Sequence, residues 1–196
     1  YLTRHRLTEQ ASGNVSARLG EAMLISPGGA TADTISPDTF VRVGLDGTVE
    51  GAGRPSSERL MHLAIYRACH EAGAVVHTHS DYCVGLSSCR EGIPGFHYLV
   101  GSFGGSDIPC TDYAVFGSDG LANQAATLLK TRFACLLANH GAIAWGRDVA
   151  EATMRAHRVE ILARQYVIAK QAGTPVLLTD EEFADYRRMV ARFSYA

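Results

Sequence analysis

The stretch Ala74-Val75-Val76-His77-Thr78-His79 decides how this sequence folds, because it is a short apolar run that ends in two histidines. Runs of this length that are rich in β-branched residues are typical of a buried strand. Residues two apart in a strand project from the same face, roughly 6 to 7 Å apart at the backbone. The segment therefore predicts a buried strand from which His77 and His79 can reach one ion.

Outward from this strand, the sequence predicts a mixed arrangement of strands and helices. Capping residues and helical spacing of apolar residues predict helices at 57–72, 80–91 (interrupted by Gly85), 118–130, 148–172 and 179–192, the last begun by a capping box at 179–182. Further strands are expected at 15–19, 22–26, 40–45, 48–50, 133–138 and 141–145, and short ones near Tyr98 and Ile108. The early hairpins favour an α/β (α+β) layer fold over an all-parallel sheet.

Length and composition fit one compact domain with a full-sized core. The chain has 196 residues, of which 46% are hydrophobic and 19% charged, and its formal net charge is -2. We predict a single domain over residues 1–196. Because the sequence begins at Tyr1 without a methionine and soon enters a polar segment, we expect an N-terminal helix to precede the numbering.

The distribution of basic, apolar and cysteine residues argues against several kinds of partner. No basic run interleaves with aromatic residues, so nucleic acid is not expected as a partner. No apolar run approaches the ~20 residues that span a bilayer, so a membrane is not expected either. The five cysteines are odd in number and lack CxxC spacing, which favours reduced thiols and a cytoplasmic protein over a disulfide framework.

A third histidine strengthens the metal hypothesis. A His-x-His pair alone is more often a polar pair on a solvated strand face, but His140 follows an apolar strand that can hold a ligand rigidly. Three histidines with an open fourth position are typical of a catalytic zinc site. Glu58 opens a helix, where the dipole already favours a carboxylate, and beside a metal it could be a fourth ligand or a general base. The other helical histidines, His62, His70 and His157, are assigned to helix faces.

Lysine is scarce, which bears on the type of chemistry. Lys130 and Lys170 are the only lysines, so the other 16 of the 18 basic residues are arginines. A Schiff base needs a lysine desolvated in a pocket, whereas both of these lie towards the ends of helical patterns. Any carbanion is therefore expected to be stabilised without an imine.

Three turns offer small residues and backbone N–H groups to an anion. Ser56 and Ser57 precede a helix, where N-capping explains one serine and leaves the other in excess. The turns at Gly13-Asn14 and at Ser26-Pro27-Gly28-Gly29 follow the same logic. Each turn alone is weak support for a phosphate site, because Pro-Gly and Gly-Gly are ordinary turn sequences.

In chain order, these segments resemble the class II aldolase/adducin family, and are closest to its L-fuculose-1-phosphate aldolase branch. The resemblance covers nearly the whole chain and extends through 93–98, 108–110 and 113–117. It rests on five motifs in register: Ala11-Ser12-Gly13-Asn14-Val15-Ser16, Ile25-Ser26-Pro27-Gly28-Gly29, Pro55-Ser56-Ser57-Glu58, Val76-His77-Thr78-His79 and Ala138-Asn139-His140-Gly141.

The resemblance implies a three-layer αβα domain with a central, largely antiparallel sheet, assembled as a homotetramer with active sites between subunits. It implies one Zn²⁺ per subunit, with Mn²⁺ or Co²⁺ as alternatives. The implied ligands are His77, His79 and His140, with Glu58 as the fourth ligand or the catalytic acid/base.

The resemblance also assigns substrate residues. Tyr98 would act on the aldehyde oxygen in the site of the neighbouring subunit, and Tyr113 and Phe116 would line the aldehyde end. Near the C-terminus, Tyr195 is a candidate for the family's tail tyrosine, although ungapped matching places Phe193 there. The implied phosphate-binding residues are Asn14, Gly28, Gly29, Ser56 and Ser57, with Gly28 standing where the aldolase branch commonly carries a hydroxyl residue.

The implied reaction is reversible cleavage of a ketose 1-phosphate, similar to L-fuculose 1-phosphate, to dihydroxyacetone phosphate and an aldehyde through a metal-stabilised enediolate. A deoxysugar, 5-deoxy or methylthio tail on the aldehyde fits equally well. Alternatives are a pentulose-5-phosphate 4-epimerase, a dehydratase or decarboxylase of the same family, and a non-catalytic adducin-like scaffold. The epimerase branch typically has aspartate after the paired serines, so Glu58 favours the aldolase, and the complete histidine set counts against the scaffold.

Overall fold

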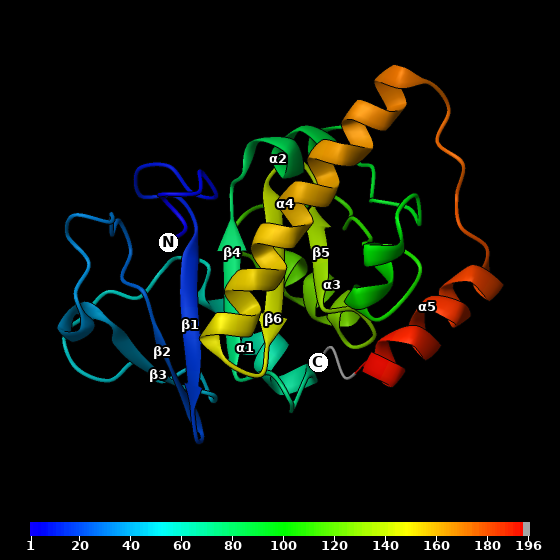
Figure 1. The fold of residues 1–196 in the computed structure, drawn as a ribbon. Helices are drawn as coiled ribbons and strands as arrows, with labels where there is room; N and C mark the ends of the chain where they lie inside the picture. The colour runs from blue at the N-terminus through cyan, green and yellow to red at the C-terminus, as the bar shows by residue number, and fades with distance from the viewer. Residues whose placement is uncertain (194–196) are drawn as a thin grey trace.

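Strand β4 (Ala74–Thr78) lies inside a six-stranded sheet and is buried along its whole length. The structure is a computed structural model, and it describes residues 1–193. The strands lie in the order β3-β2-β1-β4-β6-β5, and every neighbouring pair is antiparallel (Figure 1). The other strands are β1 (Asn14–Leu19), β2 (Ala22–Ile25), β3 (Val41–Gly44), β5 (Ala134–Leu137) and β6 (Gly141–Gly146).

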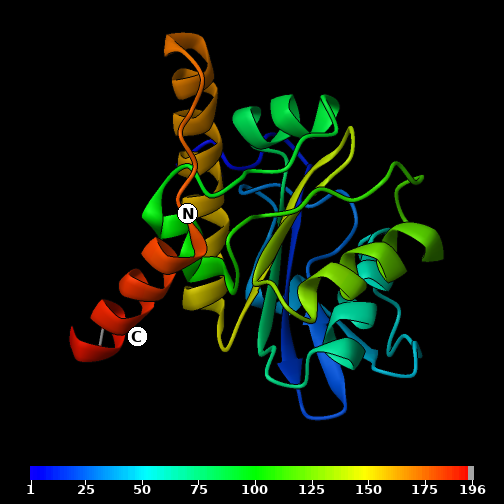
Figure 2. The same ribbon diagram turned by 90° about the vertical axis from the view of Figure 1, so that its right-hand side faces the viewer.

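Helices cover both faces of this sheet. Figure 2 shows α4 on one side and α1 with α3 on the other. Helices α1 (Arg59–Ala68) and α3 (Asp119–Leu129) pack together, and α2 (Asp81–Ser88) packs against α4 (Val149–Ala172). The predicted three-layer αβα arrangement with an antiparallel sheet is thereby confirmed.

The two helical layers enclose two separate cores, and β4 supplies both. Val75 belongs to the core under α1 and α3, whereas Val76 belongs to the core under α4. In β6, Ile143 and Ala144 divide in the same way. Because side chains alternate across a strand, His77 falls on the same face as Val75, towards α1.

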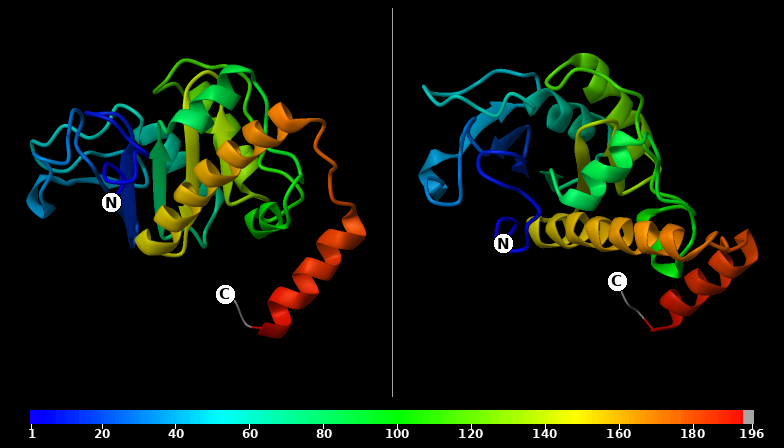
Figure 3. Two further views of the ribbon diagram at one scale, coloured as in Figure 1. Left: turned by 45° about the horizontal axis from the view of Figure 1, so that its top comes forward. Right: turned by 90° about the horizontal axis from the view of Figure 1, so that it is seen from above.

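The C-terminal helix α5 (Asp180–Phe193) stands away from the sheet (Figure 3). It packs on the 3-10 helix η2 (Tyr98–Phe103), where Phe183 is its buried side chain. A second 3-10 helix, η1 (Pro37–Thr39), precedes β3.

Several sequence-based element predictions were wrong in detail. Tyr98 begins η2 rather than flanking a strand, and Ile108 forms a single bridge with Ile93 instead of a longer ladder. The predicted strand at 48–50 is likewise one bridge, between Val49 and Val43. These segments are bent or too short for a repeated ladder of hydrogen bonds.

The helix predictions needed smaller corrections. Helix α1 ends at Ala68, short of the expected 72, and α2 runs through Gly85 without interruption. Glu58, rather than a serine, occupies the N-cap position of α1, and its backbone N–H donates to Ser56 Oγ at 3.2 Å. The Ser56 hydroxyl therefore accepts from a free N–H two residues along the chain, from a position before the N-cap.

The structure also describes the cysteines and the length and polarity of the helices. All five cysteines are unpaired, three of them buried. No helix within residues 1–193 is both long and apolar enough to cross a membrane.

Gly13 sets the approach of the chain to β1. Its φ of +74° is in the left-handed region, and a Cβ built there would lie 2.8 Å from the backbone oxygen of His77 and 2.5 Å from Thr8 Cγ2. Only glycine allows β1 to begin this close to the end of β4.

We expect Gly13→Ala to destabilise the protein by clearly more than Gly20→Ala. Both residues have positive φ, but a Cβ at Gly20 meets no atom within 4 Å. The free energy of unfolding of Gly20→Ala should therefore fall only by about 1–2 kcal/mol, the strain of an alanine in the left-handed region. In Gly13→Ala a clash with backbone adds to this loss. Urea unfolding of both variants measures the difference, and equal losses would contradict this account.

Candidate metal centre

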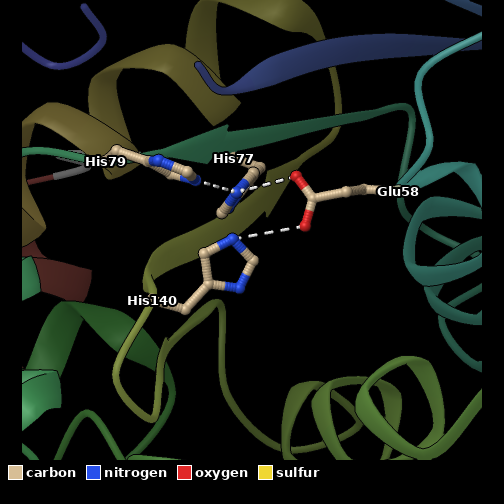
Figure 4. A group of neighbouring side chains, drawn as sticks. All are labelled: Glu58, His77, His79 and His140. Atoms are coloured by element: carbon tan, nitrogen blue, oxygen red, sulfur yellow. Dashed lines mark hydrogen bonds and ion pairs between the residues drawn. The ribbon is translucent and has the colours of Figure 1, made fainter. Parts of the chain in front are cut away.

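Four side chains from three segments meet where β4 ends (Figure 4). His77 lies in β4 and His79 just after it, His140 lies in the turn between β5 and β6, and Glu58 caps α1. One ligand atom from each side chain can be chosen so that all four lie within 4.8 Å of one another. The predicted metal ligands are thus brought together.

The distances show how closely the four groups converge. His77 Nε2 lies 2.8 Å from His79 Nε2 and 3.1 Å from Glu58 Oε2, and His140 Nε2 lies 3.3 Å from Glu58 Oε1. The three imidazole rings are mutually edge-on, with centroids 4.7 to 4.8 Å apart. They therefore direct nitrogen atoms at a common point instead of stacking.

Sheet pairing places His140 beside the other two histidines. Thr78 of β4 pairs with Ala142 of β6, so the β5–β6 turn lies next to the end of β4. At Gly141 a Cβ would overlap the backbone oxygen of Thr78, and only a residue without one permits this approach. Asn139, in the same turn, has a left-handed φ of +56°.

A backbone contact fixes which nitrogen of His77 faces the cluster. His77 Nδ1 lies 2.9 Å from the carbonyl oxygen of Ala142, which can only accept, so Nδ1 carries the proton. In the neutral ring, Nε2 is then a bare lone pair directed at the cluster. Such a backbone partner is the usual way in which a protein orients a metal-binding histidine.

Electrostatics keeps the other donors in forms that bind metals. Burial, reinforced by the neighbouring His77, lowers the pKa of His79 and of His140 to about 4. Burial by itself would raise the pKa of Glu58, but His77, His140 and the Asn14 amide hold it well below its usual range. At neutral pH, His79 and His140 are therefore neutral imidazoles and Glu58 is a carboxylate.

The donor chemistry fits a divalent transition metal. Glu58 Oε1 is buried and accepts no hydrogen bond from the described residues, which is a costly state for a carboxylate oxygen. Three imidazole nitrogens and one carboxylate oxygen match the ligands that zinc prefers. A cation at this point would supply the missing partner of Glu58.

The cluster opens into a pocket of about 380 Å³. His77 lies behind the pocket wall, fully buried. The wall includes the predicted site residues Asn14, Gly28, Gly29, Ser56, Ser57, Glu58, His79, Tyr113, Phe116 and His140. The metal-ligand cluster and the residues predicted to bind substrate therefore share one cavity.

One end of this pocket is built from two adjoining turns. A bridge between Pro27 and Pro55 brings the glycine turn beside the paired serines at the start of α1. Gly29 has a φ of +79°, which exposes backbone at the pocket wall. Backbone N–H groups and hydroxyls at a helix N-terminus form an environment suited to an anion.

Tyr98 is absent from the pocket wall that the described residues of this chain form. It is half exposed on η2, stacked on His97 at 4.6 Å between ring centroids and 5.4 Å from Tyr186 of α5. Its predicted role belongs to the site of another subunit and stays a prediction. Tyr195 lies outside the described residues, and Phe193 is exposed at the end of α5.

Two residues around the site, Asn139 and His62, were not predicted from the sequence to take part in it. Asn139 lines the pocket beside His140. His62, which was assigned only to a helix face, is fully buried and contacts Asn14 and Ser16. The spacing in the sequence could have placed His62 and Ser16 near the site, because His62 follows Glu58 by one helical turn and Ser16 follows Asn14 on the same strand face.

Comparison with known proteins agrees with this geometry. The family profile described as the class II aldolase and adducin N-terminal domain matches residues 1–167. The chain is 39% identical to L-fuculose phosphate aldolase of Escherichia coli K12 over 184 residues, covering 93% of this chain and 86% of that protein. It is also 39% identical to 5-methylthioribulose-1-phosphate/5-deoxyribulose-1-phosphate aldolase of Rhodospirillum rubrum, covering 90% of this chain and 80% of that protein.

A solved structure shows the same fold. An L-fuculose 1-phosphate aldolase superposes with a TM-score of 0.91 at 34% identity, covering 99% of this chain and 91% of the other. Because the related proteins are aldolases, the chain is a lyase rather than a non-catalytic scaffold. The profile match, the sequence identity and the shared fold show that this chain belongs to the class II aldolase and adducin family.

Proposed function

We propose that this protein is a zinc-dependent aldolase that reversibly cleaves a ketose 1-phosphate to dihydroxyacetone phosphate and an aldehyde. The observation that carries the proposal is the shared pocket, which joins a His/Glu metal-ligand cluster to turns suited to a phosphate. The relatives that act on L-fuculose phosphate and on 5-methylthioribulose 1-phosphate support the same reaction class.

The phosphate is held far from the bond that breaks. Gly28, Gly29, Ser56 and Ser57 would bind it with hydroxyls and backbone N–H groups, helped by the positive end of the α1 dipole. Asn14 lines the same pocket and donates to Glu58, so its amide would contact the substrate as well. Binding energy from the phosphate then positions the reacting carbons.

Glu58 and the three histidines serve the reacting end. His77, His79 and His140 would hold a zinc ion, which supplies the positive charge that stabilises negative charge developing on the substrate oxygens. Glu58 Oε1 faces this point without a hydrogen bond from the described residues. As a carboxylate it would remove a proton from the carbon of dihydroxyacetone phosphate in the direction of aldehyde addition; in cleavage it would first take up a proton from solvent through the pocket and then deliver it to that carbon.

The aldehyde end is open and aromatic. Tyr113 and Phe116 line it and are 56% and 64% exposed. Exposed aromatic rings beside a pocket suit an apolar aldehyde tail, or coverage by another subunit. We propose a homotetramer in which Tyr98 from a neighbouring subunit takes the proton that leaves the C4 hydroxyl during cleavage and returns a proton to the aldehyde oxygen in the reverse direction.

We expect the purified protein to release dihydroxyacetone phosphate from ketose 1-phosphates in a chelator-sensitive manner. A coupled assay should compare L-fuculose 1-phosphate, 5-deoxyribulose 1-phosphate and 5-methylthioribulose 1-phosphate, each added after the protein has been incubated with or without EDTA. Pentulose 5-phosphates belong in the same panel, because epimer formation without triose release would identify a 4-epimerase instead. Release that is insensitive to EDTA would rule out the metal-dependent mechanism.

Replacing a ligand should remove metal and activity together. We expect His79→Ala to lower the zinc content, measured by elemental mass spectrometry, from about one ion per chain to a small fraction of that. His70→Ala is the matched control, because His70 is an exposed histidine in the segment after α1. Equal zinc in the two variants would show that the cluster does not hold the ion.

Removing the Tyr98 hydroxyl should affect turnover alone. We expect Tyr98→Phe to keep its zinc and its fold but to lose about 10²- to 10⁴-fold in kcat, the range for a general acid or base. Tyr82→Phe removes an exposed hydroxyl from α2 and serves as the control. Full activity in Tyr98→Phe would refute its proposed role.

A further inference from the structure

Behind Glu58 lies a row of buried polar side chains, of which the proposed reaction uses only Asn14. Asn14 Nδ2 donates to Glu58 Oε2 at 2.9 Å, and Asn14 Oδ1 lies 2.5 Å from His62 Nε2. Ser16 Oγ lies 2.7 Å from His62 Nδ1 and 2.8 Å from the Tyr66 hydroxyl. Ser16, His62 and Tyr66 are completely inaccessible to solvent. The row connects the core under α1 to the wall of the pocket.

The chemistry of the end group fixes the direction of every bond in this row. A carboxylate can only accept, so the Asn14 atom that faces Glu58 must be the NH₂ group. The amide oxygen then faces His62, which must donate from Nε2. Burial lowers the pKa of His62 to about 3, so the ring is neutral and has a single N–H. Nδ1 consequently accepts from Ser16, whose oxygen in turn accepts from Tyr66.

We propose that His62 is a positioning residue, whose Nε2–H, with Ser16 as its hydrogen-bond partner at Nδ1, joins the Glu58 carboxylate in locking the Asn14 amide with its NH₂ group towards Glu58 and the pocket. An asparagine amide has nearly the same shape after a half-turn, so packing alone does not choose between its two orientations. The N–H of His62 and the Glu58 carboxylate make the choice together, because the other orientation would set two donors against each other at His62 and two acceptors against each other at Glu58.

Any effect of His62 on turnover rests on the proposed function. With the amide reversed, its oxygen would face the Glu58 carboxylate, and the pocket would lose a donor. Spacing supports a shared role, since Glu58, His62 and Tyr66 follow one another at intervals of four along one face of α1, and Asn14 and Ser16 share one face of β1. The orientation of Asn14 can be measured without substrate or metal.

The test uses the small number of asparagines in the chain. Asn14, Asn123 and Asn139 are the only three, and only Asn14 is buried. In protein labelled with ¹⁵N-asparagine, Asn14 should give the slowly exchanging side-chain NH₂ pair, assigned by its loss in Asn14→Asp. We expect His62→Leu to speed exchange of this pair about tenfold, which corresponds to the loss of one hydrogen bond. His62→Gln, whose amide can donate in place of Nε2, should restore slow exchange.

Matched controls distinguish a specific effect on the Asn14 side chain from a general destabilisation of the fold. Backbone amide exchange in β4 should be the same in wild type and His62→Leu, whereas a purely structural role would speed it together with the Asn14 pair. If His62→Leu does not fold, Ser16→Ala tests the same link by removing the donor to Nδ1, and faster Asn14 exchange is again expected. Unchanged Asn14 exchange in a folded variant of either kind overturns the proposal.

Turnover is read separately. If the wild type cleaves ketose 1-phosphates, His62→Leu should lower kcat and His62→Gln should recover most of it, both with unaltered zinc content. If the wild type shows no cleavage, the proposed function fails while the exchange experiment still decides the role of His62.

Discussion

Strand β4 is buried along its whole length, and much of the molecule follows from this constraint. Its alternate side chains enter two different cores, so helices must cover both faces of the sheet. Its polar end also needs partners, because buried polar groups are costly without hydrogen bonds. His77 finds a carbonyl oxygen in β6 and a carboxylate at the start of α1. The layered fold and the ligand cluster are thus two results of one buried strand that ends in histidine.

Features set by neighbouring residues could be predicted from the sequence. The apolar run before His77 predicted β4, and the capping box at 179–182 predicted the start of α5, where Thr179 and Glu182 do exchange hydrogen bonds. The segment around Tyr98 could not be predicted, because its shape depends on packing with α5, which is distant in sequence. Likewise, the position of His62 on its helix was visible, but its partners come from β1. The glycine and serine turns were each weak evidence for a phosphate site, and the family resemblance and the bridge that joins them support that proposal.

The polar row behind Glu58 illustrates what a buried network contributes. Such groups add little net stability compared with an apolar core of equal volume, since each must be taken out of water. Their value lies in selecting one arrangement, because any reversed bond leaves a donor or an acceptor without a partner. In this protein the network begins in the hydrophobic core at Tyr66 and ends at a carboxylate on the pocket wall. Rigid packing around Tyr66 in the core thereby helps to fix the orientation of the Asn14 amide at the pocket wall.

The four candidate ligand side chains differ in their access to solvent. His77 is fully buried and Glu58 nearly so, whereas His79 and His140 form part of the pocket wall. An ion held by this cluster would exchange with solution through the same mouth that admits the substrate. A sugar phosphate in the pocket would close that route, so chelators would compete with the resting enzyme far better than with the enzyme at work. Substrate supply would then govern how long each chain retains its metal.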